Sequence, residues 1–461
     1  MTWEGRGIFE VSSADPDSAT PVWVDLTVYV NDVVMTPTLR TGRQNDLDQT
    51  EPSQLQLVLN NADDRFTYGN TSSPYGAWWG PGRRCRYRDV VAGAVVPLFV
   101  GFLQTPTEGL VTASIDQRVG ITAVDRLGRL QNSRTLISTL AEHIIYNAGQ
   151  AIRGYWTFSQ IPSADYFKLS DQAQWTDNLG AALLSVPTDT GAPSISAGGP
   201  VAADELGVVS LAAATGTTAG RAIITAAPDI RVVGPWPIAA GQAVTLVGWF
   251  SPALPADPRT AIPLTLITAS NVITIDFSAG AGAPLTISST GALVGSLSAD
   301  YLTNSQWTPV AFRYDYTVPS LEVWIRSARY TVPLVGAPPA SESILVFSAP
   351  TDYAGQVGHV QLYIGTDYTY AKFLAQYQMA YTVLERQTTG DRIRLIAQYA
   401  GIPDAELLQV DKGQSLMQAA SLAGQTPLDA MQDAARTEQG LLYVDGNGNL
   451  VFRDRRSLYN I

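Results

Sequence analysis

The spacing of the apolar residues changes along this chain of 461 residues, and each spacing favours one kind of secondary structure. In residues 1–131 apolar and polar residues alternate in short runs between turn residues, as in VWVDLTVYV from Val22 to Val30. A period of two places alternate side chains on one face of a strand. We therefore expect an all-β domain here, folded as a small barrel or a strongly curled sheet.

The period lengthens to that of an α-helix between Ser133 and Gly149. Leu136, Leu140 and Ile144 fall on one face of such a helix, and Gly149 is suited to ending it. Residues 132–153 are therefore predicted to form a connecting helix and linker.

Residues 154–381 are rich in Ala, Gly, Ser, Thr and Pro, and short strand-like runs follow one another there without a helical pattern between them. The clearest runs are AVTLVGWFS, PLTLITAS, NVITIDFSA, PLTISST, WTPVAFRYDY, LEVWIRSARYTV, ILVFSA and GHVQLYIG. Many short strands in succession are typical of two packed sheets. We expect a β-sandwich of the jelly-roll type.

Residues 382–461 mix helical and strand patterns. DRIRLIAQYAGIPD predicts one helix, and Thr426 followed by Pro427 supplies the cap and first residue of a second. Two apolar strands then meet through DGNG at Asp445–Gly448, which is a strong hairpin signal. This segment is predicted to be a small α+β unit.

The charge balance excludes one class of partner. The chain has 41 acidic and 29 basic residues and a net charge of -12, so most of its surface repels a phosphate backbone. Arg83, Arg84, Arg86 and Arg88 form a local basic patch that we interpret as a solvated face or an interface. We expect no specific binding of nucleic acid.

Cys85 is the single cysteine, which excludes an internal disulfide and fits synthesis in a reducing cytoplasm. The opening residues MTWEGRGIFEVSS lack the pattern of a secretory signal. The most apolar run, Val90–Leu103, is shorter than the roughly 18 residues that a membrane-spanning helix needs. Gly93 and Pro97 interrupt it, so we expect two buried strands around a turn and no membrane insertion.

Few residues in this chain suggest catalysis. His143 and His359 are far apart in sequence, whereas metal sites and hydrolytic triads need converging side chains. Glycoside hydrolysis needs two carboxyl groups about 5–10 Å apart, and the strands that hold Glu322 and Asp276 offer only one acid each. We expect no catalytic residue, no metal, no cofactor and no enzyme activity.

Aromatic residues are the remaining candidates. Trp236, Tyr301 and Tyr353 fall at turns of the predicted sandwich, with Asp352 beside the last, and exposed rings can stack on sugars. These four are the candidate carbohydrate-binding residues, although an aromatic residue at a turn is more often a packing lid.

The pair Trp78-Trp79 lies between glycines and is interpreted as a loop anchor, against either a neighbouring subunit or its own barrel. Together with Arg83 and Arg86, these tryptophans are the candidate interface residues.

The N-terminal segment resembles the opening domain of minor tail proteins from siphophages of actinobacteria. The similar stretches are WVDLTVYV, GRQNDLDQTEPSQLQLVLNNADDRFTYGNTSSPYG, RCRYRD, LFVGFLQ and ITAVDRLGRLQ, in this order. Near the other end, QTPLDAMQDAARTEQGLLYVDGNGNLVFRDR resembles the helix and hairpin of the same tail-hub proteins. The middle segment is similar to concanavalin A-like and laminin-G-like domains in GYWTF, in WTPVAFRYDY with LEVWIRS, and in GHVQLYIGTDYTYAKFLAQYQ.

The resemblance implies a mainly β fold in which a hub-type β-barrel domain is split by an inserted jelly-roll β-sandwich, with a small α+β C-terminal segment. It implies a structural protein of the virion tail tip, a baseplate hub that forms a ring with its own copies, as a trimer. Its other partners would be the distal tail protein, the tail tube and further tip proteins, with the sandwich contacting host surface glycans. The alternatives are a carbohydrate-binding adhesin module without a hub role and a cell-envelope glycoside hydrolase.

Overall fold

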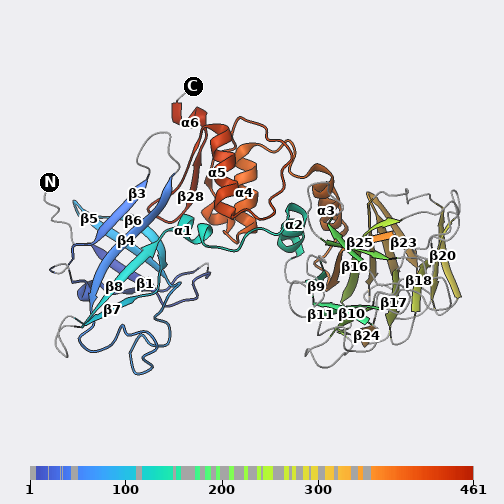
Figure 1. Cartoon of the computed structure of the whole chain (residues 1–461), viewed down its shortest axis with the longest axis horizontal. Helices are drawn as coiled ribbons and strands as arrows, with labels where there is room; N and C mark the ends of the chain where they lie inside the picture. Colours follow the sequence, from blue (N-terminus) through green and yellow to red (C-terminus); the bar gives the residue numbers. More distant parts are fainter. Residues whose placement is uncertain are drawn as a thin grey trace. The chain divides into compact units, whose positions relative to one another are not determined.

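The structure is a computed structural model of the whole chain. It describes residues 7–459 except 19, 32, 34, 43–49, 111–116, 149–151, 157–171, 177–181, 188–193, 198–206, 212–222, 227–235, 240–241, 253–263, 269–271, 277–283, 290–291, 299–306, 316–319, 334–340 and 346–354. The chain divides into two compact units (Figure 1): unit 1 comprises Met1–Leu136 and Leu384–Ile461, and unit 2 comprises Ile137–Val383. The chain is mainly β, with largely antiparallel sheets and few helices, which confirms the predicted fold class. The finer division at residues 131, 153 and 381 stays a prediction.

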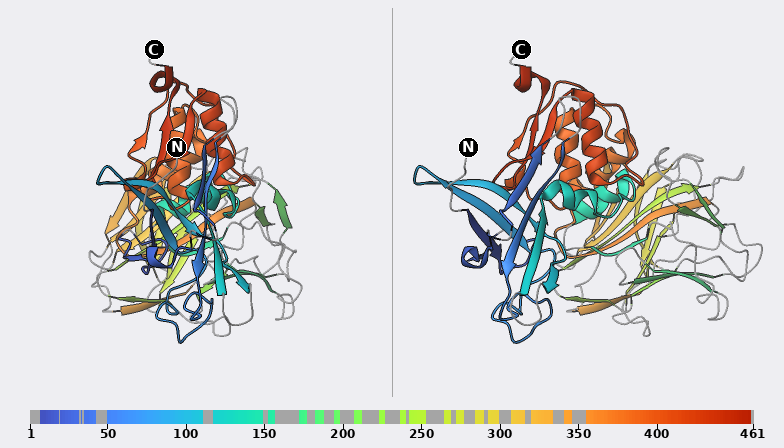
Figure 2. Two further views of the ribbon diagram at one scale, coloured as in Figure 1. Left: turned by 90° about the vertical axis from the view of Figure 1, so that its left-hand side faces the viewer. Right: turned by 60° about the vertical axis from the view of Figure 1, so that its left-hand side comes forward.

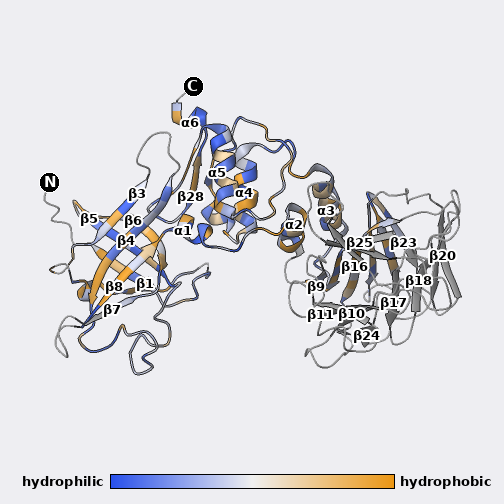
Figure 3. Ribbon diagram, in the orientation of Figure 1, coloured by the Kyte–Doolittle hydropathy of each residue, from blue (hydrophilic) through white to orange (hydrophobic). Residues whose placement is uncertain are grey.

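The N-terminal part of unit 1 is an eight-stranded antiparallel sheet with the order β2-β1-β5-β6-β8-β4-β3, in which β7 pairs with β8. Its elements are β1 (Ile8–Ser12), β2 (Trp23–Asp25), η1 (Thr27–Tyr29), β3 (Thr38–Gly42), β4 (Glu51–Asn60), β5 (Arg84–Val91), β6 (Ala94–Leu103), β7 (Thr107–Leu110) and β8 (Gln117–Val124). Leu55, Leu57 and Leu59 on β4 are buried and alternate with more exposed residues, as the period of two predicts. The same alternation is visible in the colours of Figure 3. These leucines share one core with residues of β1, β5, β6 and β8, so the sheet curls around its own interior.

The C-terminal part of unit 1 packs helices beside a three-stranded sheet of order β26-β28-β27. Its elements are η4 (Asp404–Glu406), α4 (Thr389–Tyr399), α5 (Pro427–Glu438), α6 (Arg455–Tyr459), β26 (Gln409–Val410), β27 (Leu441–Val444) and β28 (Leu450–Arg453), and α1 (Arg126–Gln131) follows β8. The Thr426 side chain accepts a hydrogen bond from the backbone of Asp429, and Pro427 is at the start of α5. The helix cap and the Asp445–Gly448 hairpin turn are therefore confirmed.

Unit 2 contains two large antiparallel sheets, as expected for a sandwich. One has eight strands in the order β12-β13-β25-β16-β21-β22-β23 with β9 beside β25, and the other has six in the order β15-β24-β17-β18-β19-β20. Strands β10, β11 and β14 form a third sheet. The bounds are α2 (Thr139–Ala148), β9 (Ile152–Trp156), β10 (Gln172–Thr176), β11 (Ala182–Pro187), β12 (Ser194–Ala197), β13 (Gly207–Leu211), β14 (Ile223–Ala226), β15 (Trp236–Ala239), β16 (Ala243–Pro252), β17 (Leu264–Thr268), β18 (Val272–Asp276), β19 (Pro284–Ser289), β20 (Ala292–Ser298), β21 (Thr308–Asp315), β22 (Ser320–Ile325), β23 (Ala328–Pro333), β24 (Ser341–Leu345), β25 (Gly355–Ile364) and α3 (Tyr370–Thr382).

The apolar run Val90–Leu103 forms the end of β5, a turn and β6, so the two strands and the turn are confirmed. The prediction that both strands are buried is wrong at the turn end, because Val91 is 53% exposed and Val95 49% exposed. The reason is the strand pairing: among the described residues, β1 pairs with β5 only up to Arg88, and β8 pairs with β6 only at Phe102 and Leu103. In the part of the chain that the structure describes, no helix is long and apolar enough to cross a bilayer.

Candidate functional site

The arginines of β5 lie on the outer face of the unit 1 sheet. Alternation in β5 turns Cys85 and Tyr87 inward and leaves Arg84, Arg86 and Arg88 partly exposed. Glu10 on β1 lies directly across from Arg86. Its carboxylate accepts hydrogen bonds from Arg86 Nε at 2.6 Å and Nη2 at 2.8 Å, and Arg88 Nη2 lies 2.5 Å from Glu10 Oε2.

This arrangement changes the acidity of Glu10. Burial alone would raise the pKa of its carboxyl group, but hydrogen bonds and charge from Arg86 and Arg88 outweigh burial and lower the pKa below its usual value. The guanidinium of Arg86 also lies 4.3 Å from the ring centre of Trp23, a cation–π distance. Two of the four arginines of the basic patch therefore face an acid of the same sheet.

The other two arginines of the patch also have partners inside unit 1. Arg83 Nη1 donates to the carbonyl of Ala14 at 2.8 Å, and Arg84 Nη2 lies 3.2 Å from Glu406 Oε1. Arg126 at the start of α1 forms an ion pair with the other oxygen of Glu406. These groups are only 11–14% exposed, and they join the first and last segments of the chain. The basic patch is thus compensated by intramolecular partners, which disfavours the free cationic surface that nucleic acid would need.

The two tryptophans of the candidate interface lie on the loop between β4 and β5 and differ in burial. Trp79 is 4% exposed, belongs to the core of unit 1 and donates from Nε1 to the carbonyl of Phe66 at 2.8 Å. Trp78 is half-buried, with its ring centre 5.4 Å from that of Tyr75. The sequence left open whether the tryptophan pair anchors the loop against a neighbouring subunit or against its own barrel. Trp79 packs against its own domain. The interface role of Trp78 stays a prediction.

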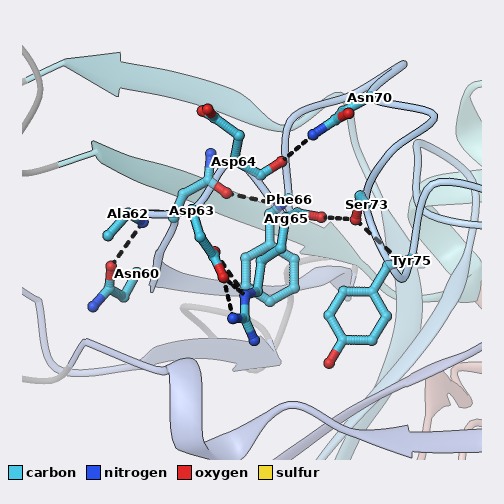
Figure 4. A network of polar contacts seen from close by, with 10 residues as sticks. Asn60, Ala62, Asp63, Asp64, Arg65, Phe66, Asn70, Ser73 and Tyr75 are labelled. Atoms are coloured by element: carbon cyan, nitrogen blue, oxygen red, sulfur yellow. Dashed lines mark hydrogen bonds and ion pairs between the residues drawn. The ribbon is translucent and has the colours of Figure 1, made fainter.

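Side chains of the same loop hold its backbone in shape (Figure 4). Ser73 Oγ donates to the carbonyl of Arg65 at 2.5 Å, and Asn70 Nδ2 donates to the carbonyl of Asp64 at 2.9 Å. Arg65 forms an ion pair with Asp63, and its guanidinium lies 4.4 Å from the ring centre of Tyr29. A long surface loop that is tied by its own side chains presents a fixed shape, as a binding surface requires.

The candidate sugar-binding residues of unit 2 are only partly described. Trp236 is the first residue of β15 and pairs in register with Ile344 of β24. Tyr301, Asp352 and Tyr353 lie outside the described residues. The structure therefore does not test whether these four side chains meet, and the sugar site stays a prediction.

The two histidines lie in separate buried environments of unit 2. His359 on β25 is 1% exposed, and its Nδ1 lies 2.7 Å from the hydroxyl of Tyr155. His143 on α2 is 8% exposed and lies 2.6 Å from Asn147 Nδ2, and burial lowers its pKa to about 4. Among the described residues, no group of three or more His, Cys, Asp or Glu side chains could hold a metal ion.

Of the two acids considered for glycoside hydrolysis, Glu322 is engaged in an ion pair. Its carboxylate accepts from Arg329 Nη2 at 2.6 Å and from the indole of Trp324 at 2.9 Å. Asp276 is the last residue of β18 in the other large sheet. Glu322 therefore links its own strand β22 to the neighbouring strand β23, because Arg329 lies on β23 and pairs in register with Trp324 of β22.

Sequence reasoning did not single out the carboxylates that organise unit 1. Two of these carboxylates are Glu10 and Glu406. The third is Glu438, which is fully buried at the end of α5. It accepts from Thr389 Oγ1 at 3.0 Å and from the backbone of Ser415 at 2.8 Å. Burial raises its pKa, but these hydrogen bonds outweigh burial and lower the pKa. The available signal was an acid inside an apolar strand, as in IFEVS for Glu10.

No protein-family model and no curated protein sequence matches this chain. Among solved structures, domain 4 of AbnA, a GH43 extracellular arabinanase from Geobacillus stearothermophilus in complex with arabinotriose, is 15% identical, with 50% of this chain and 98% of that chain covered and a TM-score of 0.30. The binding domain of botulinum neurotoxin DC in complex with SialylT is 11% identical, with 53% and 54% covered and a TM-score of 0.34, so this chain spans only about half of it. Basic winged bean lectin with Tn-antigen is 12% identical, with 46% and 98% covered and a TM-score of 0.29. Such low TM-scores carry no argument about the fold or function of this chain.

Proposed function

We propose that this chain is a structural, non-enzymatic protein of a bacteriophage tail tip. Unit 1 assembles with copies of itself, as a trimer, into the ring at the distal end of the tail tube, where it contacts the distal tail protein and other tip proteins. The protein is made in the cytoplasm of the host bacterium. The observation that carries the proposal is that the first and last segments, which both resemble tail-hub proteins, pack into one unit.

Specific contacts join the two segments of unit 1. Glu406 faces both Arg84 and Arg126, and the Asp445–Gly448 turn lies against β6, where a Cβ on Gly446 would be 2.3 Å from the carbonyl oxygen of Pro97. A hub module with an inserted sandwich needs such a joint, because the insertion separates the two segments in sequence.

In the ring that we propose, the terminal strands of the unit 1 sheet are the places where copies meet. Among the described residues, the path of paired strands ends at β2 on one side and at β3 on the other, and beyond η1 a single bridge joins Val30 to Leu59 of β4. Unpaired strand edges invite association, and pairing around a closed ring satisfies them without leaving a free edge. Such a protein acts through the shape of its assembly and not through catalysis. In agreement with this role, ion pairs with arginines engage Glu10, Glu322 and Glu406.

In the proposal unit 2 contacts a host surface glycan. A jelly-roll sandwich offers broad exposed faces, and weak sugar binding by each copy gains strength when several copies act together. A glycan array probed with the full chain should show binding that is lost in Trp236→Ala and kept in Trp78→Ala, which alters unit 1. An array without any bound glycan removes this part of the proposal and leaves the tail-tip role intact.

The tail-tip role is tested with an antibody against unit 2 on negatively stained phage particles that carry this protein. We expect label at the distal end of the tail, and sedimentation of the purified chain as a closed oligomer. Unlabelled tails together with a monomer at all concentrations would overturn the proposal.

A further inference from the structure

The connection between α3 and α4, residues 383–387, has an unusual backbone. The chain passes here from unit 2 into unit 1. Val383 has φ 46°, Leu384 φ 67° and Arg386 φ 62°, all in the left-handed region that favours glycine. Side chains other than glycine are uncommon there, a β-branched one most of all, and each costs conformational free energy that the surrounding structure must offset. The connection is therefore strained.

The local sequence of the connection favours a helix. Phe373, Gln376 and Ala380 are the buried residues of α3, and Leu384, which is also buried, follows at the same helical spacing. The connection reads VLERQ, in which Leu, Glu, Arg and Gln are good helix formers, and it contains neither glycine nor proline. Right-handed backbone here would add about one turn to α3. Disagreement between local preference and observed conformation is expected at functional or strained sites.

Contacts within unit 1 hold the connection in its left-handed form. Arg392 is on α4, the helix that packs beside α5 (Figure 2). Its Nη2 donates to the carbonyls of Leu384 at 2.6 Å and of Gln418 at 2.7 Å, and these two bonds are here called the clamp. The backbone N–H of Arg386 donates to the carbonyl of Met417 at 3.0 Å. Conversion to a helix would break this last bond, because a helical N–H donates four residues back along the chain.

The clamp is itself costly to maintain. Arg392 is 3% exposed, and among the described residues its guanidinium contacts carbonyls and no carboxylate. Burial lowers its pKa, as expected for a charge held out of water. In the described part of the protein, Arg392 Nε and the side-chain oxygen of Gln387 are buried without a hydrogen-bond partner. Buried charge and unpaired polar atoms cost free energy, so clamp and backbone both carry a cost that the helical form would remove.

We propose that residues 383–387 are a conformational switch between the clamped left-handed form and a helical form in which α3 gains about one turn. The switch lies where unit 2 is joined to unit 1, and the helical form would take the carbonyl of Leu384 away from Arg392. A ligand or assembly partner of unit 2 that prefers one form of α3 would shift the population of the clamp in unit 1. The switch does not depend on a role in a phage tail.

A pair of introduced histidines detects the helical form in the full chain. Histidines four residues apart on one helix face bind a metal ion such as Ni²⁺ together. Tyr381→His with Glu385→His places this pair across the connection, at two exposed residues. Gln378→His with Thr382→His places a control pair entirely within α3, also at exposed residues. The two natural histidines are buried and do not compete.

Titration calorimetry with Ni²⁺ then compares the two pairs. The control pair should bind about tenfold more tightly than the pair across the connection, because only a minor helical population binds in the second case. Arg392→Met opens the clamp and should tighten the second pair about threefold or more while it leaves the control pair unchanged. Equal affinities of the two pairs, or no response to a folded Arg392→Met variant, would overturn the proposal.

Arg386→Gly tests the strain without touching the clamp. Arg386 is exposed, and glycine adopts its φ of 62° at little cost, so the melting temperature of the full chain should rise. Binding of Ni²⁺ by the pair across the connection should weaken, because glycine disfavours the helical form. Glu385→Gly is the matched control, at an exposed neighbour without positive φ, and should lower the melting temperature. Equal melting temperatures for the two glycine variants would show an unstrained connection and would overturn the proposal, whether or not Arg392→Met folds.

Discussion

At the scale of single residues, unit 1 depends on carboxylates that each face more than one arginine. Glu406 is the clearest case, because it lies between Arg84 of the N-terminal sheet and Arg126 at the start of α1. Glu406→Gln keeps the shape of the side chain and removes its charge. Loss of one partner from a largely buried ion pair leaves the others uncompensated and costs about 3 kcal/mol.

We therefore expect urea denaturation to show a loss of about that size in the free energy of unfolding of unit 1. Glu51→Gln is the matched control, because its pair with Arg40 is 56% and 64% exposed and should contribute less than about 1 kcal/mol. Equal effects of the two substitutions would show that Glu406 does not organise the unit.

A pH effect is expected from His143 on α2. Burial lowers its pKa to about 4 from an ordinary value of 6.5, so the unfolded chain binds the proton more readily than the folded one. Stability is therefore complete above pH 6.5 and falls as the pH decreases to about 4, by about 3 kcal/mol in total. Calorimetry of unit 2 melting in the full chain should show this decline. His143→Gln should flatten that part of the profile, which separates it from the carboxylates.

At the scale of elements, the sequence predicted what local pattern determines. The alternation in β4, the cap at Thr426 and the turn at Asp445–Gly448 follow from residues close together in the chain. The exposed turn end of β5 and β6 could not be predicted, because its exposure depends on where β1 and β8 stop pairing. The pairing of Glu10 with Arg86 depends on strand order in the same way.

Alanine substitution at two glycines with similar backbone conformations distinguishes the energetic cost of local backbone strain from the cost of disturbed packing between elements. Gly42 has φ +91°, and a Cβ there would meet no described residue other than its chain neighbours within 4 Å. Gly448 has φ +87°, and a Cβ there would lie 2.9 Å from Val100. Gly42→Ala should cost about 1 kcal/mol through the backbone alone. Gly448→Ala should cost roughly 1–3 kcal/mol more, because the β27–β28 turn must move away from β6. Equal losses in denaturant unfolding would mean that the turn does not pack closely on the sheet.

At the scale of the whole molecule, the chain returns to complete unit 1 after unit 2 has been inserted. This return was foreseen only through the likeness of both end segments to one family, since no local pattern connects them. The contacts that close the unit are long-range: the backbone N–H of Leu136 donates to Gln425, and Gln432 donates to the carbonyl of Thr50. Neither segment retains these contacts alone.

Separate expression of the two segments tests this dependence. Residues 1–136 and 384–461, produced as two chains in one cell, should copurify as a folded complex, because the ion pairs at Glu406 and the helix α1–α5 contact need no covalent link. The association should be weaker than the intramolecular one, since it loses the high effective concentration that unit 2 provides by connecting the segments. Glu406→Gln in the shorter chain should weaken copurification further, while Arg436→Gln, whose exposed pair with Asp433 lies within α5, should not. If residues 1–136 fold alone and ignore the second chain, the two segments are independent bodies, and the insertion of unit 2 into a single hub module is refuted.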